Sequence, residues 1–358
     1  MRIVFFIPPL RRASGGLFTI YKTAANLSAL GVDVAFMGPS DATPGLQEAL
    51  LHGPTLLPWG SALGQNDIWC IPEGWPNALP VGQNSGARTI VYVQSWIYML
   101  DTLPNGVTWQ QLPLEYIAVS RPVAHFLKNV IGVTPLGIVP PVVDDLFFHA
   151  SQTKKQPGMK QKTGPVRVGW MPRKNKALGE QARRVCELRL AHMSGMPGMT
   201  SAPRVEWVTI DKVSQDKVAY LLGSCHIFLS TGFPEGFALP PAEAMAAGCV
   251  VVGCTGFGGW DYMRQASVDG FSLPWGPPLD FNLSDDKVGE IPSDSKRCGN
   301  GFYTPDGDSL AAGTALAQAV YFAHRAGEDW LATRACAQSA VTPYSNKAQQ
   351  AALAALLL

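Results

Sequence analysis

The chain has 358 residues, with 28 Lys and Arg against 27 Asp and Glu, so its formal net charge is +1. Hydrophobic residues make up 47% of the chain and charged residues only 15%, which excludes a disordered protein and allows two domains that each bury a core. A charge so close to zero gives no electrostatic reason to expect nucleic acid as a partner.

The first apolar run, residues 3–7, is followed by two prolines and then two arginines, the reverse of a secretory signal peptide. Because no stretch of about 18 apolar residues occurs, we expect no transmembrane segment and a cytoplasmic location. The 7 cysteines contain no C-x-x-C pair and the 6 histidines are scattered. We therefore expect buried thiols instead of a disulfide framework, no metal site and no bound cofactor.

Short apolar runs alternate with helical patterns along the chain, which is typical of an α/β protein with parallel sheets. The runs predicted to be strands are residues 3–7, 32–37, 68–71, 89–93, 117–119 and 137–139 in one series, and 166–170, 205–209, 226–230 and 249–252 in a second. Several are apolar on both faces, as strands covered by helices on both sides must be. We therefore expect two Rossmann-like layers.

The first helix has the clearest signals, because Ser14 is a good N-cap, an apolar stripe follows it and Gly31 ends it. Further helices are predicted near residues 121–130, 175–192, 215–222, 309–324 and 345–358. The polar, basic segment Ser151–Gly164 separates the two series of strands, and we interpret it as the interdomain linker. Its lysines also allow a peripheral contact with an anionic membrane.

The predicted organisation follows from these elements. An N-terminal domain spans residues 1–150 and a linker spans 151–164. A C-terminal domain spans 165–340, and a last helix spans 341–358. A second irregular stretch, Pro274–Asn300, is interpreted as a surface excursion.

The most informative segment is Phe233–Gly248, which reads FPEGFALPPAEAMAAG and follows the strand predicted at 226–230. Pro241 suits a first helical turn, so Glu235 is expected in the loop at the carboxyl end of the strand and Glu243 in the first turn of a short helix. Backbone N–H groups of the loop and of the helix N-terminus then converge, which favours a phosphate or a sugar hydroxyl between them.

This segment closely resembles the E-x7-E signature of retaining glycosyltransferases with the GT-B fold, the family four type that includes sucrose synthases and bacterial mannosyltransferases. The family pattern E-G-F-G-L-P-x-x-E-A-M-A-x-G is matched in its core except at Ala238, where the family has glycine. Further similar segments are Ser14-Gly15-Gly16, Val119-Ser120, Pro140–Asp144, Gly169–Lys176 and Gly299–Asp308. The P-R-K-N form and Tyr92-Val93-Gln94 are more similar to the rhamnosyltransferase-like branch.

The resemblance implies an α/β GT-B fold with two Rossmann-like domains facing across a cleft. The first domain would hold the acceptor, the second would bind the nucleotide-sugar, and the last helix would pack back on the first domain. The implied reaction transfers a sugar from a nucleotide-diphosphate-sugar to a hydroxyl of a glycan, lipid or protein, with retention of anomeric configuration and without a metal.

The resemblance also implies a role for each site residue. Glu235 would lie beside the transferred sugar, where a carboxylate stabilises the developing positive charge. Arg173 and Lys176, or Lys174, would neutralise the leaving diphosphate. Glu243 would bond the ribose. The other implied contacts with the donor come from Gly236, Phe237, Ala238 and Leu239, and from Gly15 and Gly16 of the N-terminal loop.

Two departures keep alternatives open. Many family members place a histidine near the sugar, whereas Val91–Trp96 contains none, and the spacing between Arg173 and Lys176 is compressed. A nucleotide-sugar hydrolase or epimerase of the same fold is one alternative, and a non-catalytic GT-B binding protein is the other.

One acidic motif and two tryptophans have both a functional and a structural interpretation. Asp306-Gly307-Asp308 has the D-x-D spacing of metal-dependent glycosyltransferases of the other major fold. Between a strand-like Phe302-Tyr303 and a helix from Ser309, we interpret it as a turn and helix cap. Trp96 and Trp260 are placed where sugar stacking is conceivable, with core packing as the default interpretation.

Overall fold

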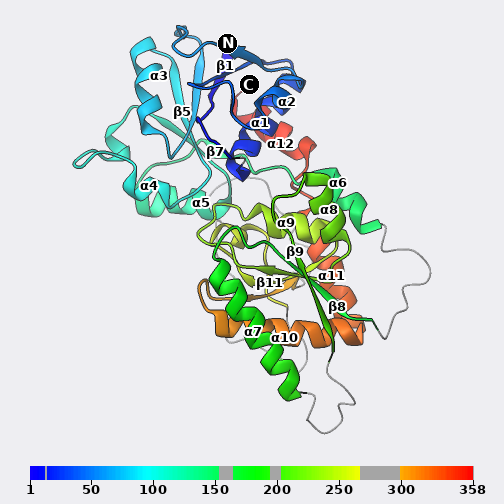
Figure 1. Ribbon diagram of the computed structural model, residues 1–358. Helices are drawn as coiled ribbons and strands as arrows, with labels where there is room; N and C mark the ends of the chain where they lie inside the picture. Colours follow the sequence, from blue (N-terminus) through cyan, green and yellow to red (C-terminus); the bar gives the residue numbers. More distant parts are fainter. Residues whose placement is uncertain (13, 153–163, 194–202, 267–298, 358) are drawn as a thin grey trace. The chain divides into compact units, whose positions relative to one another are not determined.

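The computed structural model describes residues 1–12, 14–152, 164–193, 203–266 and 299–357 (Figure 1). The chain divides into two compact units. The N-terminal unit comprises Met1–Val142 together with Tyr344–Leu358, and the C-terminal unit comprises Val143–Pro343.

The N-terminal unit is built on a parallel sheet with the strand order β3-β2-β1-β4-β5-β6-β7. Its strands are β1 (Arg2–Phe6), β2 (Asp33–Met37), β3 (Thr55–Leu57), β4 (Ile68–Pro72), β5 (Arg88–Val93), β6 (Glu115–Ala118) and β7 (Gly137–Ile138). The central strands are buried along almost their whole length, as a sheet covered on both faces requires. Only β3 was not predicted, because this short edge strand is largely exposed and lacks a long apolar run.

Helices cover both faces of this sheet. They are α1 (Gly15–Ala29), α2 (Leu46–Leu50), α3 (Leu79–Ser85), α4 (Tyr98–Asp101), α5 (Arg121–Phe126) and α12 (Asn346–Leu357), with short 3₁₀ turns at Pro76–Ala78 and Trp109–Gln111 and a π turn at Leu127–Ile131. Ser14 caps α1 as predicted, because its hydroxyl accepts the N–H of Leu17 at 3.2 Å. Helix α12 packs against α1, and Gln349 joins it to Asn26 of α1 at 2.6 Å and to the backbone oxygen of Pro140 at 2.7 Å.

The C-terminal unit has a second parallel sheet, with the order β12-β11-β10-β8-β9. Its strands are β8 (Val166–Trp170), β9 (Val205–Thr209), β10 (Ile227–Ser230), β11 (Val250–Cys254) and β12 (Gly301–Thr304). Helices α7 (Lys176–Met193) and α10 (Ser309–Arg325) pack together on one face. The other face is covered by α9 (Leu239–Ala246) and α11 (Glu328–Val341), and α6 (Asp145–Gln152) and α8 (Gln215–Gly223) pack beside α9.

The boundary between the units differs from the one expected at residue 150. The chain leaves the N-terminal unit at Val142, and α6 already belongs to the C-terminal unit. Helix α6 packs so closely on α8 that a Cβ on Gly223 would lie 2.8 Å from the backbone oxygen of Ala150. Both flanks of the segment 151–164 therefore lie in one unit, so this segment is not an interdomain linker. Residues 153–163, and residues 274–298 of the predicted excursion, lie outside the described residues.

Each sheet contains one point where the strand order reverses. In the N-terminal unit the chain runs from β1 out to β3, then returns to β4 on the other side of β1. In the C-terminal unit the reversal lies between β8 and β10. Ligands of open parallel sheets bind outside the carboxyl ends of the strands at such a reversal. We call these places the N-terminal switch point (ends of β1 and β4) and the C-terminal switch point (ends of β8 and β10).

Most of the cysteines in the described residues are buried thiols, as expected: Cys70, Cys186, Cys225, Cys249 and Cys254. Cys336 is an exception, because it is disulfide-bonded. The expectation of thiols throughout is therefore wrong at this position, since a single pairing leaves no spacing signature in a sequence.

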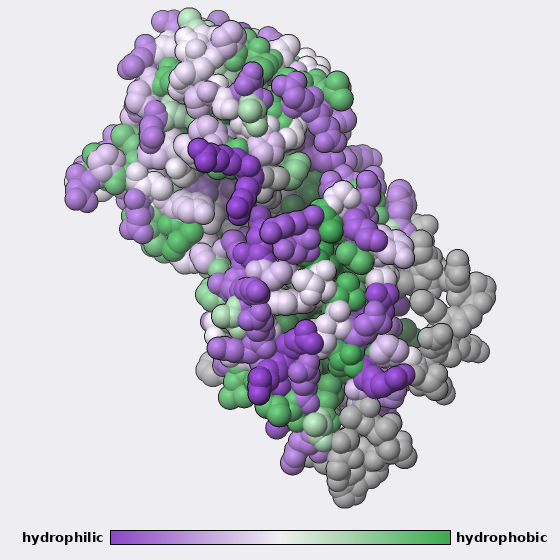
Figure 2. All heavy atoms as spheres, in the orientation of Figure 1, coloured by the Kyte–Doolittle hydropathy of each residue, from purple (hydrophilic) through white to green (hydrophobic). Residues whose placement is uncertain are grey.

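Within the described part of the chain, no helix combines the length and the apolar character needed to cross a membrane. The face drawn in Figure 2 shows hydrophobic residues in patches between hydrophilic ones.

Candidate functional site

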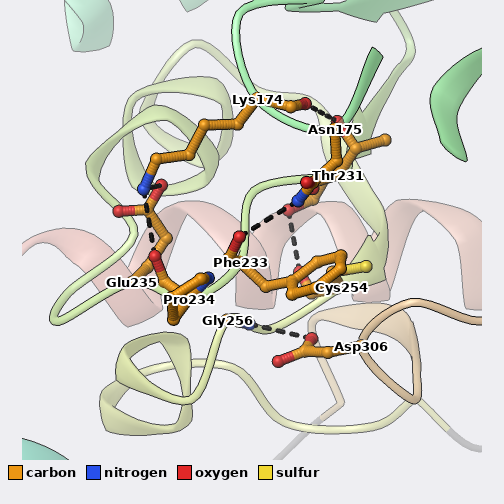
Figure 3. Close-up of polar contacts among 10 residues, drawn as sticks. Lys174, Asn175, Thr231, Phe233, Pro234, Glu235, Cys254, Gly256 and Asp306 are labelled. Atoms are coloured by element: carbon orange, nitrogen blue, oxygen red, sulfur yellow. Dashed lines mark hydrogen bonds and ion pairs between the residues drawn. The ribbon is translucent and has the colours of Figure 1, made fainter. Parts of the chain in front are cut away.

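At the C-terminal switch point, the loop after β8 and the loop after β10 are tied together by side chain to backbone hydrogen bonds (Figure 3). The side-chain amide of Asn175 donates to the backbone oxygens of Thr231 at 2.8 Å and Phe233 at 3.0 Å. The hydroxyl of Thr231 donates in return to the backbone oxygen of Lys174 at 3.1 Å. Asn175 adopts a positive φ of 54°, which asparagine tolerates better than most residues. These bonds fix both loops against each other.

Across the two loops, Lys174 and Glu235 point toward one another (Figure 3). The Lys174 Nζ lies 2.9 Å from Glu235 Oε1 and donates to the backbone oxygen of Pro234 at 3.0 Å. The two side chains keep 41% and 21% of their surface exposed, so the pair is reachable from solvent. An ion pair of this kind contributes only about 0–1 kcal/mol to the stability of the fold. Stability alone therefore explains poorly why the pair is present.

The backbone of Glu235 is held by the loop after β11. The Glu235 N–H donates to the oxygen of Gly256 at 2.8 Å, and the N–H of Gly258 donates to the oxygen of Glu235 at 3.0 Å. Gly258 must be glycine, because a Cβ there would lie 2.1 Å from the carbonyl carbon of Gly236. The carboxylate of Glu235 therefore projects from a rigid base.

Asp306, in the turn that follows β12, supports the same loop. Its Oδ1 accepts the N–H group of Thr255 at 3.1 Å. It also accepts the N–H group of Gly256 at 3.0 Å (Figure 3). Burial raises the pKa of this carboxyl, and the two N–H bonds oppose that effect. Asp308 caps α10 by accepting the N–H of Ala311 at 2.8 Å. The interpretation of Asp306-Gly307-Asp308 as a turn and helix cap is confirmed.

The start of α9 shows why glycine would suit the position that Ala238 occupies. Ala238 is the N-cap and adopts the left-handed conformation, with φ 64° and ψ 61°. This conformation costs a residue with a Cβ about 1–2 kcal/mol. The hydroxyl of Tyr262 donates to the backbone oxygen of Ala238 at 2.5 Å. The ring of Tyr262 packs on that of Phe237, with 5.2 Å between the ring centroids. Pro240 and Pro241 follow within the first turn and carry no N–H, so α9 offers fewer donors to an anion than expected.

Glu243 does not lie where the sequence placed it. Helix α9 begins at Leu239, no acidic residue occupies its first turn, and Glu243 lies in the following turn. The prediction was wrong because the helix begins two residues before Pro241. Burial raises the pKa of the Glu243 carboxyl to about 8; Asp144 adds to this rise and Arg173 opposes it.

Several of the predicted site residues gather in one pocket of the C-terminal unit. Arg173, Lys174, Glu235 and Ala238 line it, together with Ser230, Thr231 and Pro240. Arg173 is exposed, whereas Gly236 and Phe237 are buried and Leu239 is half-buried. A pocket with cations, a carboxylate and hydroxyls at a switch point is suited to an anionic, hydroxyl-rich ligand.

Other predicted residues lie elsewhere. Lys176 is exposed on α7 and pairs with Glu180, 3.5 Å away, outside the pocket lining. Gly15 and Gly16 form the start of α1 in the N-terminal unit. Trp96 packs on the ring of Phe126 and Trp260 on that of Phe257, with 5.6 Å and 5.3 Å between the ring centroids. These contacts agree with the interpretation of both tryptophans as packing residues.

Sequence reasoning missed the residues that hold the site together, Asn175, Thr231 and Asp306. Asn175 carried a usable signal, because asparagine next to a predicted strand end often adopts a left-handed turn conformation and bonds the backbone. Among the described residues, no group of three or more His, Cys, Asp or Glu is placed to hold a metal ion.

Comparison with known proteins adds to this picture. No protein-family model matches the chain. An alpha-1,6-glucosyltransferase of Actinobacillus pleuropneumoniae serotype 7 (strain AP76) is 22% identical over 289 residues, covering 80% of this chain and 82% of that protein.

Solved structures align over nearly the whole chain. A glycosyltransferase from Rickettsia africae ESF-5 has a TM-score of 0.62 at 15% identity, covering 99% of this chain and 97% of the other. The catalytic domain of starch synthase IV from Arabidopsis thaliana, bound to ADP and acarbose, has a TM-score of 0.55 at 12% identity, covering 99% and 98%. With two parallel sheets in two Rossmann-like domains, the chain has the α/β GT-B fold of these glycosyltransferases.

Proposed function

We propose that this protein is a glycosyltransferase that takes a sugar from a nucleotide-diphosphate-sugar and transfers it to an acceptor hydroxyl. The observation that carries the proposal is the solvent-accessible Lys174–Glu235 pair in a pocket that Arg173 also lines, at the C-terminal switch point. The weak likeness to an alpha-1,6-glucosyltransferase supports the same activity.

The cations of the pocket suit a leaving diphosphate. Among the described residues Lys174 Nζ has two acceptors, Glu235 and the oxygen of Pro234, so its third N–H is able to donate to a phosphate oxygen. Arg173 presents an exposed guanidinium beside it. Positive groups placed before the bond breaks stabilise the charge that develops on the leaving group. We therefore propose that transfer proceeds without a required metal.

The carboxyl groups suit the sugar and the ribose. Glu235 projects from a rigid loop and would lie beside the transferred sugar, where its charge stabilises an oxocarbenium-like centre. Glu243 would bond the ribose: burial raises the pKa of its carboxyl to about 8, and a protonated carboxyl is able both to donate to and to accept from a hydroxyl.

We further propose retention of anomeric configuration, as in the family with the E-x7-E signature. The name of the relative from Actinobacillus specifies an α-linkage in its product. Where the donor sugar is α-linked to its diphosphate, an α-linked product means retention.

The test is an assay of the full chain with UDP-glucose, ADP-glucose, GDP-mannose and dTDP-rhamnose as donors and p-nitrophenyl glycosides as acceptors. The last donor tests the rhamnosyl-transferring branch of the family. We expect one donor to give a glycosylated product whose anomeric coupling in NMR matches the donor, with activity that survives EDTA. Glu235→Gln should abolish most of the turnover, whereas Glu180→Gln, which changes a surface carboxylate on α7, should leave it unchanged.

Three other outcomes would change the assignment. Release of free sugar with no acceptor product would indicate a hydrolase. Binding of a nucleotide-sugar without turnover would indicate a non-catalytic binding protein. Complete loss of activity with EDTA, restored by a divalent ion, would overturn metal independence.

A further inference from the structure

The two aspartates of the Asp306-Gly307-Asp308 turn hold different parts of the C-terminal unit, although only one residue separates them. Asp308 holds a helix, because it accepts the N–H of Ala311 at the start of α10. Asp306 holds the loop after β11, because its Oδ1 accepts the N–H groups of both Thr255 and Gly256 (Figure 3). The helix cap accounts for Asp308, but it does not account for Asp306.

The loop that Asp306 holds is bonded to the backbone of Glu235 on both sides. Gly256 accepts the N–H of Glu235 at 2.8 Å, and the N–H of Gly258 donates to the oxygen of Glu235 at 3.0 Å. Gly256 also lies against the side chain, since a Cβ added to it would be 2.9 Å from Glu235 Cβ and 2.7 Å from the backbone oxygen of Gly232. A shift of this loop would therefore move Glu235 as well.

Between these bonds, Phe257 has a strained backbone. Its φ of 71° and ψ of −57° are close to a γ-turn conformation that is rare for any residue and an outlier for a bulky one. Phe257 forms an isolated parallel bridge with Glu235. Strained residues persist only where their surroundings hold them, and they are concentrated at functional sites. The bonds from Asp306 to the two residues before Phe257 are part of what holds this conformation.

The exposure of these residues shows what Asp306 contributes. Thr255 and Gly256 are buried, so their N–H groups need an acceptor. Asp306 is exposed as a residue, so it fills no space in the core, and its contribution lies in the two bonds that its oxygen accepts. One oxygen accepts both bonds, so a neutral amide oxygen at the same place would serve as well as a carboxylate.

We propose that Asp306 is a positioning residue for the transfer reaction, which acts through the loop after β11 to hold the carboxylate of Glu235 opposite Lys174. The Lys174–Glu235 distance of 2.9 Å depends on the place of the Glu235 backbone, and small displacements of a reacting group reduce rates strongly. The inference rests on the proposed function, which gives Glu235 a role beside the transferred sugar and gives Asp306 none.

The test measures steady-state kinetics of the full chain with whichever of UDP-glucose, ADP-glucose, GDP-mannose and dTDP-rhamnose wild type consumes. Asp306→Ala should lower kcat about tenfold or more and leave the donor KM within about threefold, because Arg173 and Lys174 still bind the diphosphate. Asp306→Asn keeps the accepting oxygen and should retain most of the turnover. Asp308→Ala is the matched control: it removes the cap of α10 and should lower the melting temperature without lowering kcat.

Two further variants test whether Asp306 acts by geometry and through Glu235. Asp306→Glu keeps the charge but moves the oxygens by one methylene, so it should lose more turnover than Asp306→Asn, even where Asp306→Ala unfolds. The double variant Asp306→Ala with Glu235→Gln should be no slower than Glu235→Gln alone, measured with radiolabelled donor, because residues that act as a unit are not additive.

The contrary outcomes are distinct. If Asp306→Ala lowers the melting temperature but not kcat, its role is only structural. If Asp306→Asn is as slow as Asp306→Ala, the residue acts by its charge, and if the double variant multiplies the two losses, it does not act through Glu235. Each of these results overturns the positioning inference while the proposed function stands. If wild type consumes none of the four donors, the proposed function fails and the inference fails with it.

Discussion

The two switch points share a topology and differ in chemistry. At the C-terminal switch point, a pocket is lined by Arg173, Lys174 and Glu235, and the Lys174–Glu235 ion pair is accessible to solvent. The N-terminal switch point presents aromatic rings and the buried carboxyl of Glu73, which accepts backbone N–H groups and pairs with no cation in the described part of the chain. Cations at the C-terminal sheet match the charged leaving group of the proposed sugar transfer. The strand order determines where a site can form on each sheet, and the loop residues determine the chemistry of that site.

Both switch points use the same device to become rigid. At each switch point, a carboxylate from one loop accepts backbone N–H groups of a neighbouring loop. Asp306 accepts those of Thr255 and Gly256. Glu73 accepts those of Gln94 and Ser95. Such supports fix the position of the neighbouring loops and of the side chains that these loops carry. The comparison is tested most sharply by changing one member of each site.

The largest effect is expected at Lys174. Lys174→Ala removes the cation that faces both Glu235 and the site proposed for the diphosphate, so turnover should fall about a hundredfold or more, as for other lost transition-state charges. Lys176→Ala is the matched control, since Lys176 pairs with Glu180 on the surface of α7 and should leave turnover within about twofold of wild type. Steady-state kinetics with saturating donor measures both.

The opposite ranking would be informative. If Lys176→Ala were the damaging change, the family-based assignment of that lysine would be right and the ion pair of Lys174 merely structural. The loops after β8 and β10 would then have to rearrange when donor binds.

The next effect in size is the pH dependence of stability at Glu73. Burial raises the pKa of Glu73 to about 7 from an ordinary value of 4.5. Between these values the folded protein keeps a proton that the unfolded chain loses, so the free energy of unfolding falls as pH rises from about 4.5 to about 7, by roughly 3 kcal/mol, and changes no further above it. Glu73→Gln should lack this slope. Urea unfolding at pH 5 and pH 8 measures the difference.

The design isolates Glu73 from its neighbours. Glu243 contributes a slope of the same sign up to about pH 8, but it is present in both proteins and cancels in the comparison. The nearest titrating groups, Tyr92 and Cys70, have pKa values raised far above this window by burial. Equal slopes for wild type and Glu73→Gln would mean that the carboxyl is hydrated, and the picture of a buried support would be wrong.

Much of the fold could be predicted from the sequence, because burial on both faces leaves continuous apolar runs. The runs at residues 3–7 and 166–170 mark β1 and β8, and Ser14 marks the start of α1. Glu235 could be placed at a strand end because HIFLS and the following Gly and Pro punctuate the chain.

The remainder depended on contacts that a sequence does not reveal. The boundary at Val142 is set by the packing of α6 on α8, and the start of α9 is set by the left-handed Ala238 that Tyr262 holds. Glu73 and Asp306 look like ordinary loop acids until their backbone partners are known. Lys174, Lys176 and Arg173 stand too close in sequence for spacing alone to show which lysine faces the pocket.

The smallest effect expected distinguishes two roles for the glycines at the start of α1. A Cβ on Gly15 meets nothing within 4 Å, whereas one on Gly16 would push the side chain of Gln94. Gly15→Ala should raise the free energy of unfolding by about 0.5 kcal/mol, because alanine restricts the unfolded chain more than glycine does. Gly16→Ala should unfold like wild type within about 0.5 kcal/mol, since the atoms that a Cβ would meet belong to the end of the flexible Gln94 side chain. Donor titrations of the two variants decide the role of Gly16. Weaker donor binding in Gly16→Ala alone supports the close approach to the diphosphate that the family resemblance implies, and equal donor binding in both variants counts against it.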